Sequence, residues 1–150
     1  MTYQQLDAIA DGVNPALAIL ALLLPFFVRP SQQYGRLAFL LNTGISMAVM
    51  YAIAWVDRIA GLWSAFRLDY SQHTGFAAVL VFSLFAWNRR FGAVLAIVLI
   101  GYVALMLYQE YHTIADMLTT VMIIVPATLA IHLLGRTAER GRQLATARKH

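Results

Sequence analysis

The sequence contains no cysteine and few charged residues. Of its 150 residues, 12% are Asp, Glu, Lys or Arg, and 61% are hydrophobic. The missing cysteine excludes disulfide bonds and thiolate metal sites. The charged fraction is about half of the roughly 25% that is usual in soluble domains. A single domain of this length could not bury so much apolar surface in water, so composition favours an integral membrane protein.

The first residues also lack positive charge. Residues 1–12 contain Asp7 and Asp11 but no Lys or Arg. A secretory signal begins with a basic stretch ahead of its apolar run. We therefore expect the first hydrophobic segment to be retained in the membrane domain.

Five apolar runs divide the chain. A helix that spans a bilayer needs about 20 residues, within a range of roughly 17–25. The first run reaches this length if it starts near Ile9, and the third if its helix begins near Ser71. The sequence predicts an all-α fold, a polytopic helical bundle with about five transmembrane helices in one domain, residues 1–135. The runs are 9–28, 37–56, 74–88, 91–108 and 114–134.

The charged residues sort to opposite sides of such a bundle. Five spans place alternate loops on two sides, and nine of the 11 basic residues fall on one of them. The positive-inside rule makes that side cytoplasmic. We therefore expect the N-terminus and the loops 57–73 and 109–115 to be external. The nine residues are Arg29, Arg36, Arg89, Arg90, Arg136, Arg140, Arg142, Arg148 and Lys149.

Residues 136–150 are expected to form a basic cytoplasmic tail. The tail can act as a topology determinant that rests on anionic headgroups, or as an arm for a partner or nucleic acid. Its position after the last span favours the first interpretation, with membrane lipids and no nucleic acid as partners. The small size is typical of a bacterial inner-membrane protein and is compatible with a homo-oligomer. His132 is expected to be a packed or hydrogen-bonded helix residue.

Histidine and aspartate occur in mirror-image spacing at two edges of the external side. The first set runs from Asp69 to His73 and the second from His112 to Asp116. Ionisable groups are unfavourable within hydrocarbon, so paired sets at membrane edges indicate a functional site. An Asp one turn from a His can accept its ring N–H and fix its tautomer, a role that we expect Asp116 to have toward His112.

His73 falls at the start of the third predicted helix. Ser71 is a candidate N-cap of this helix, whose free N–H groups and dipole favour an anion. Arg58 and Arg67 are the only basic residues on the external side, and both can neutralise phosphate oxygens. These residues are sufficient for phosphoryl transfer at a membrane surface.

Two of these segments resemble motifs of the type 2 phosphatidic acid phosphatase superfamily, a family of integral membrane lipid phosphatases. The chain reads Tyr-Ser-Gln-His at 70–73, where the family has Pro-Ser-Gly-His. The His112-x-x-x-Asp116 pattern is similar to the end of the family motif Ser-Arg-x5-His-x3-Asp. The resemblance covers residues 57–134.

The chain departs from the family pattern at several positions. Its second motif lacks the Pro and the Gly, and Leu105 and Met106 occupy the Ser-Arg positions of the third. The first family motif, Lys-x6-Arg-Pro, is matched only by Arg58 and Arg67, with Leu68 in place of the proline. The two histidines, the aspartate and the expected topology are what the chain shares with the family.

The resemblance implies an enzyme, a membrane lipid phosphatase that hydrolyses a lipid phosphate or diphosphate at the external face. His112 would be the nucleophile that forms a phosphohistidine, Asp116 would orient it, and His73 would protonate the leaving oxygen. The resemblance implies no cofactor, and the partner is the lipid phosphate substrate. The substrate-binding residues would be Arg58, Arg67, Ser71 and Thr74.

Three other functions fit the same residues. A lipid headgroup phosphotransferase of the same superfamily would pass the phosphate group to a second lipid. A metal-dependent membrane hydrolase would use oxygen and nitrogen ligands suited to zinc, manganese or iron. A non-catalytic accessory or transport subunit would use the polar loops for contacts alone. The metal ligands would be Asp69, His73, His112 and Asp116.

Overall fold

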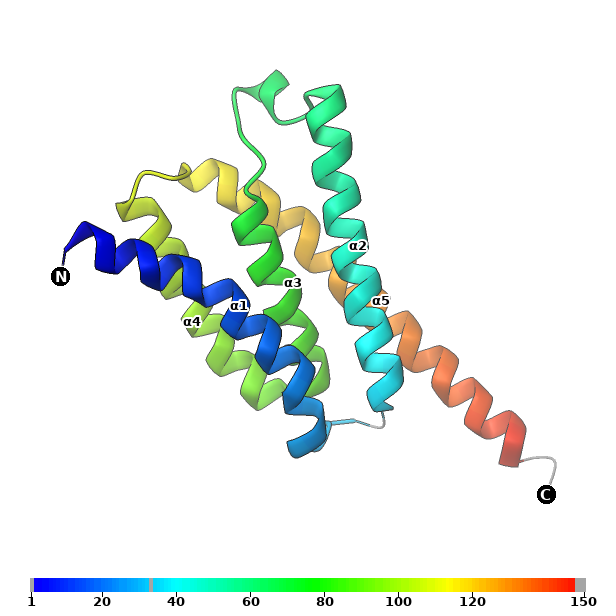
Figure 1. Ribbon diagram of the computed structural model, residues 1–150. Coiled ribbons are helices and arrows are strands. Elements are labelled where there is room, and N and C mark those ends of the chain that lie inside the picture. The colour runs from blue at the N-terminus through cyan, green and yellow to red at the C-terminus, as the bar shows by residue number, and fades with distance from the viewer. Residues whose placement is uncertain (1, 33, 148–150) are drawn as a thin grey trace.

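The computed structural model describes residues 2–32 and 34–147, and it is a bundle of helices (Figure 1). No strand occurs in these described residues, which confirms the predicted all-α fold. A short 3-10 helix, η1 (Ser64–Phe66), lies in the connection between α2 and α3. The α-helices are α1 (Tyr3–Phe27), α2 (Arg36–Ala60), α3 (Gln72–Trp87), α4 (Arg89–Tyr108) and α5 (Ile114–Ala147).

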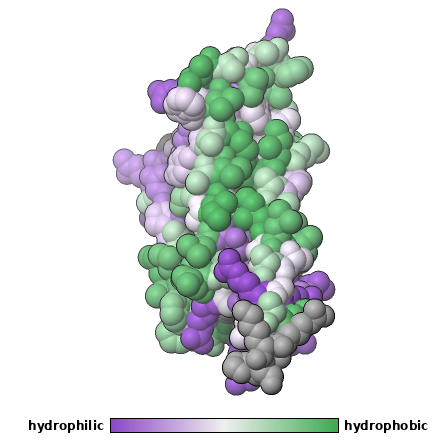
Figure 2. All heavy atoms as spheres, turned by 90° about the vertical axis from the view of Figure 1, so that its right-hand side faces the viewer, coloured by the Kyte–Doolittle hydropathy of each residue, from purple (hydrophilic) through white to green (hydrophobic). Residues whose placement is uncertain are grey.

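Four helices, α1, α2, α4 and α5, are long and apolar enough to cross a membrane. Hydrophobic side chains cover most of the face in Figure 2, and hydrophilic ones gather mainly toward its ends and along one edge. Large apolar side chains such as Phe27, Ile97 and Met122 are exposed along the helices. Such surface is unfavourable in water and suited to lipid, so the fold indicates an integral membrane protein.

Helix α3 is shorter than the other α-helices and forms the centre of the bundle. Its 16 residues extend about 24 Å, less than the roughly 30 Å of a hydrocarbon core. It contacts each of the other four α-helices, and most of its residues are buried (Figure 1). Since neighbouring helices rather than lipid surround α3, its length need not match the bilayer.

The tight turn between α3 and α4 is explained by two residues. Asn88 ends α3, and its side-chain oxygen accepts the N–H groups of Arg90 (3.1 Å) and Phe91 (3.2 Å), which caps α4. A Cβ added at Gly92 would lie 2.1 Å from Phe85 Cα. Glycine therefore permits the close approach of the two helices after a one-residue turn.

The connections gather at two opposite ends of the bundle (Figure 1). The histidine end holds the α2–α3 connection, residues 61–71, and the α4–α5 connection, residues 109–113, with His73 and His112. The arginine end holds the α1–α2 connection and Asn88, with Arg29 and Arg89. This grouping of the loops is the one that the alternation of the apolar runs predicts.

The expected basic tail continues α5 as far as the structure describes it. Position 135, the predicted boundary, falls inside this helix of 34 residues, which is about 51 Å long. Figure 1 shows its C-terminal part extending beyond the other helices. Arg148, Lys149 and His150 lie outside the described residues.

The arginine end is joined by a buried polar network around His132. The ring Nδ1 lies 2.9 Å from the Tyr34 hydroxyl, and Nε2 lies 2.9 Å from Ser83 Oγ. Asn42 Nδ2 donates to the same Tyr34 hydroxyl over 2.7 Å. The network joins α2, α3 and α5 to the α1–α2 connection and confirms that His132 is a packed, hydrogen-bonded residue.

Candidate functional site

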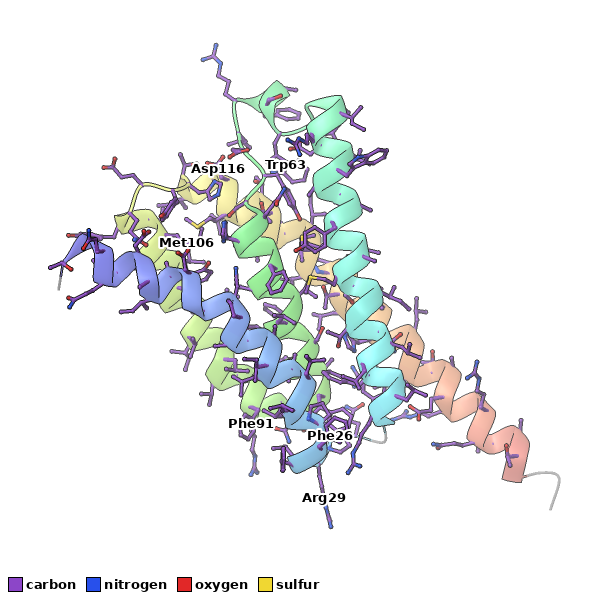
Figure 3. All side chains as sticks on the ribbon, in the orientation of Figure 1. Phe26, Arg29, Trp63, Phe91, Met106 and Asp116 are labelled. Carbon is purple, nitrogen blue, oxygen red and sulfur yellow. The ribbon has the colours of Figure 1, made fainter. Side chains whose placement is uncertain are left out.

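Asp116 ties the two connections of the histidine end together. Its side chain is buried, and Oδ1 accepts the backbone N–H of Asp69 over 2.7 Å. The other oxygen, Oδ2, accepts the N–H (2.9 Å) and the hydroxyl (2.7 Å) of Thr113. The Thr113 hydroxyl accepts the Asp116 N–H in return (3.2 Å), which caps the start of α5. Figure 3 shows Asp116 beside the start of α3.

The carboxylate next to the His112 ring belongs to Asp69 and not to Asp116. His112 Nδ1 lies 3.6 Å from Asp69 Oδ2. The expectation that Asp116 accepts the His112 ring N–H is corrected, because the ring pairs with Asp69. The Asp116 carboxylate accepts hydrogen bonds from Asp69 and Thr113, and it interacts with His112 through charge. Asp116 instead holds the backbone of Asp69, whose side chain faces the His112 ring.

A cavity of about 350 Å³, which we call the His112 pocket, opens beside this pair. The His112 side chain is 13% exposed and that of Asp69 is 76% exposed, so the pair is reached from the solvent side. The lining holds three carboxylates and one histidine, and no arginine or lysine of the described chain takes part. The lining residues are Asp69, Leu107, Glu110, Tyr111, His112, Thr113 and Asp116.

His73 is exposed in the first turn of α3 and faces α1. It lines a small cavity of about 60 Å³ with Asp11 and Tyr102, and a groove of about 250 Å³ with Asn14. The Asn14 amide donates to the His73 carbonyl and to the Tyr102 hydroxyl, each over 3.4 Å. Tyr111 lines both the small cavity and the His112 pocket. The two histidines therefore border neighbouring cavities that share one wall.

Ser71 is the N-cap of α3, as the sequence predicts. Its hydroxyl donates to Thr74 Oγ1 (2.8 Å) and accepts the Thr74 N–H (3.4 Å), while its own N–H donates to Thr120 Oγ1 (3.1 Å). Ser71 and Thr74 are completely buried. Their expected role in binding substrate is therefore corrected to a structural one, in which both cap the start of α3 and Ser71 joins it to α5.

The structure does not bring Arg58 and Arg67, the two arginines that the sequence predicts on the external side, to the histidines. Arg58 lies in the last turn of α2, and Arg67 has a left-handed φ of 58° after η1. Both side chains are exposed, and neither lines the cavities beside His73 or His112 in the described chain. A phosphate at His112 would meet these guanidinium groups only after the side chains, or the α2–α3 connection, change conformation.

The expected metal ligands are also separated. Within residues 2–32 and 34–147, no group of three or more His, Cys, Asp or Glu side chains is arranged to hold a metal ion. Asp69 and His112 form a pair, Asp116 is engaged by N–H and O–H donors, and His73 borders a different cavity. The set of four ligands that the spacing suggested is therefore not assembled.

Trp63 gives the α2–α3 connection its shape. Its indole N–H donates to Thr119 Oγ1 on α5 (3.0 Å), and its backbone N–H donates to Asp57 Oδ1 (2.8 Å). Its ring packs edge-to-face on Tyr70, with centroids 5.0 Å apart. Burial, and then the nearby Asp57 carboxylate, raise the pKa of Tyr70, so this phenol stays neutral and serves packing. Such contacts between distant residues have no local sequence signal.

Comparison of the chain with models of protein families, with curated proteins and with solved structures finds no match.

Proposed function

We propose that the protein is a lipid phosphatase that hydrolyses a phospholipid or polyprenyl phosphate or diphosphate through a phosphohistidine at His112. The observation that carries the proposal is the His112–Asp69 pair, 3.6 Å apart, beside a cavity at the end of an apolar bundle. The proposal also follows the motif resemblance. The lipid chains stay among the helices while the phosphate reacts at the wet edge.

Asp69 determines which ring nitrogen of His112 can react. The carboxylate faces Nδ1, so the proton belongs on Nδ1 and the lone pair on Nε2 is free for phosphorus. The new bond forms between Nε2 and the terminal phosphorus as the bond from that phosphorus to the departing oxygen breaks. The leaving group is the lipid alcohol when the substrate is a monophosphate and the lipid monophosphate when it is a diphosphate. Asp69 then attracts the positive charge that the phosphorylated imidazole carries.

His73 completes the first step by giving a proton to the departing oxygen of the lipid. Its position beside a cavity that shares Tyr111 with the His112 pocket supports this role. In the second step a water molecule attacks phosphorus and gives up a proton to neutral His73. Inorganic phosphate leaves, and the lone pair returns to Nε2 of His112.

Arg58 and Arg67 supply the positive charge that the His112 pocket lacks. Three carboxylates line this pocket, so a bare phosphate would be repelled. The exposed arginines lie on α2 and just after η1, at the same end of the bundle. In the proposed complex their guanidinium groups turn toward the phosphate and offset its charge.

The proposal also assigns the membrane orientation. Nine of the 11 basic residues are predicted on one side, so the arginine end faces the cytoplasm and the histidine end faces outward. In a bacterial inner membrane, the site then acts on lipid phosphates of the outer leaflet.

The direct test is a screen of phosphatidic acid and polyprenyl diphosphate with the purified protein. Wild type is expected to release inorganic phosphate, and the His112→Ala and His73→Ala variants are expected to lose this activity. His150→Ala is the matched histidine control and should keep it. New phosphorylated lipids without phosphate release would instead identify a headgroup transferase.

A second candidate is a non-catalytic accessory subunit. The observation that supports this candidate is the acidic lining of the His112 pocket, to which no arginine of residues 2–32 and 34–147 contributes. Genetic complementation separates the two candidates. If the protein is an accessory subunit, wild type and the His112→Ala variant should complement a deletion strain equally well. If it is the phosphatase, only wild type should complement the strain.

A further inference from the structure

A second cavity, which we call the α5 groove, lies next to the His112 pocket. Leu68 lines the groove and Asp69, the next residue, lines the pocket. The groove has a volume of about 300 Å³, at the lower end of the roughly 300–1,000 Å³ of small-molecule sites. Its walls come from the α2–α3 connection and from α5: Leu62, Trp63, Phe66, Leu68, Thr119 and Ile123.

The lining of the α5 groove offers almost no hydrogen bonds to a ligand. Thr119 carries its one hydroxyl, which accepts the Trp63 indole N–H (3.0 Å) and donates to the Ala115 carbonyl (2.8 Å). The indole N–H is thereby satisfied as well. A molecule in the groove is therefore recognised by apolar contact.

The groove is held open by hydrogen bonds around Trp63. The Trp63 carbonyl accepts the N–H groups of Phe66 (2.9 Å) and Leu68 (3.0 Å), which closes the chain into a compact turn. Its indole is fixed to α5 through Thr119. Figure 3 shows Trp63 in the angle between α2 and the start of α3. The cavity is thus part of the folded scaffold.

The rim of the groove consists of apolar side chains that are exposed on the surface of the bundle. Phe66 is 77% exposed, and Leu62 and Ile123 are each nearly half exposed. On α5, Thr119 lies about one turn from Asp116, which lines the His112 pocket. Carboxylates and a histidine line the His112 pocket, and apolar side chains line the α5 groove, about one helical turn away. A molecule that occupies both cavities therefore has its polar part in the pocket and its apolar part in the groove.

We propose that the α5 groove binds one acyl or prenyl chain of the lipid whose phosphate reacts at His112. This inference rests on the proposed function. Lipid chains are the medium that covers exposed apolar side chains at the end of a membrane span, and the lining fits no polar occupant. The volume suits a segment of one chain and not a complete two-chain lipid.

The test uses lipids with a photoactivatable group on one chain, phosphatidic acid and a polyprenyl phosphate, in nanodiscs of phosphatidylcholine. Crosslinks are expected in the peptides that contain residues 62–68 and 119–123. Excess unlabelled lipid of the same kind should remove these crosslinks, and extra phosphatidylcholine should not. Ile123→Trp, which fills the groove, should lose most of them, while Ile97→Trp on the exposed face of α4 should keep them.

Two outcomes would overturn the proposal. With both probes, either the crosslinks spread evenly along the exposed helices, or an excess of unlabelled phosphate lipid fails to reduce them. His112→Ala separates it from the proposed function. If His112→Ala still forms crosslinks that unlabelled lipid removes, and releases phosphate as wild type does, the lipid-chain site is supported and the catalytic role of His112 is refuted. If activity depends on His112 but no crosslinks form in the groove, the proposed phosphatase function is supported and the lipid-chain site in the α5 groove is refuted.

Discussion

The exchange of roles between Asp69 and Asp116 gives the most discriminating prediction. Asp116→Ala removes three hydrogen bonds from a buried carboxylate, two of them donated by backbone N–H groups. Hydrogen bonds to charged groups contribute about 1.5–3 kcal/mol each, and loss of a cap about 1 kcal/mol. In the variant, water can form hydrogen bonds with the backbone N–H groups of the exposed residues Asp69 and Thr113, which recovers part of this free energy. We therefore expect the variant to be destabilised by about 3 kcal/mol.

Asp69→Ala is the matched comparison. The Asp69 side chain is 76% exposed and forms an ion pair with His112 over 3.6 Å. Loss of such a surface group changes stability by no more than about 0.5 kcal/mol. Phosphate release should nevertheless fall strongly, because His112 loses the carboxylate that faces Nδ1.

Thermal unfolding in detergent, followed by circular dichroism, measures the first effect. For a chain of this length 1 kcal/mol corresponds to roughly 2–4 °C, so Asp116→Ala should lower the unfolding temperature by about 6–12 °C. Asp69→Ala should leave it nearly unchanged. Equal unfolding temperatures for wild type and Asp116→Ala would refute the assignment of Asp116 as the structural anchor. Full activity of Asp69→Ala would refute the pairing of Asp69 with His112 as the catalytic arrangement.

Three further predictions test the rest of the fold and its orientation. Gly92→Ala should lower the unfolding temperature, because its Cβ would lie 2.1 Å from Phe85 Cα, whereas Gly101→Ala on the same helix, with open space around it, should be neutral or stabilising. His132→Ala should destabilise by about 3 kcal/mol, since it removes a buried side chain and two hydrogen-bond partners, and activity per folded molecule should not change. In this cysteine-free chain, Ala65→Cys should react with an impermeant maleimide from outside intact cells and Ala138→Cys only after lysis; the reverse pattern would invert the proposed topology.

The helices could be predicted because apolar runs are a local property of the chain. The fourth run, 91–108, differs from α4 only by the first turn, which Asn88 caps. Helix α1 begins six residues before the first run, at Tyr3, because Thr2 and Gln5 form a capping box ahead of the apolar residues. At the other end, α5 continues past 134 through a less apolar stretch, 135–147, in which good helix formers (Ala, Arg, Glu, Gln and Leu) outnumber Gly and Thr.

The candidate site could be predicted only in part. Ser71 was identifiable as an N-cap because capping depends on residues three positions away. The partnership of Asp116 with Asp69 was not, because the Asp69 N–H reaches it from a connection 47 residues earlier. Trp63 is likewise held by distant partners, since its ring is buried against Tyr70 and its indole N–H donates to Thr119. Tertiary packing determines these contacts, and periodicity carries no information about them.

The central claim is that His112 carries the phosphate group during turnover. The most direct measurement is acid-labile, base-stable labelling of the protein by phosphatidic acid that carries radioactive phosphate, with the labelled peptide identified by mass spectrometry. We expect the label on the peptide that contains His112 in wild type, and its loss in His112→Ala. Phosphate release that continues in His112→Ala, or turnover of the lipid with no label on His112, would contradict the proposed function.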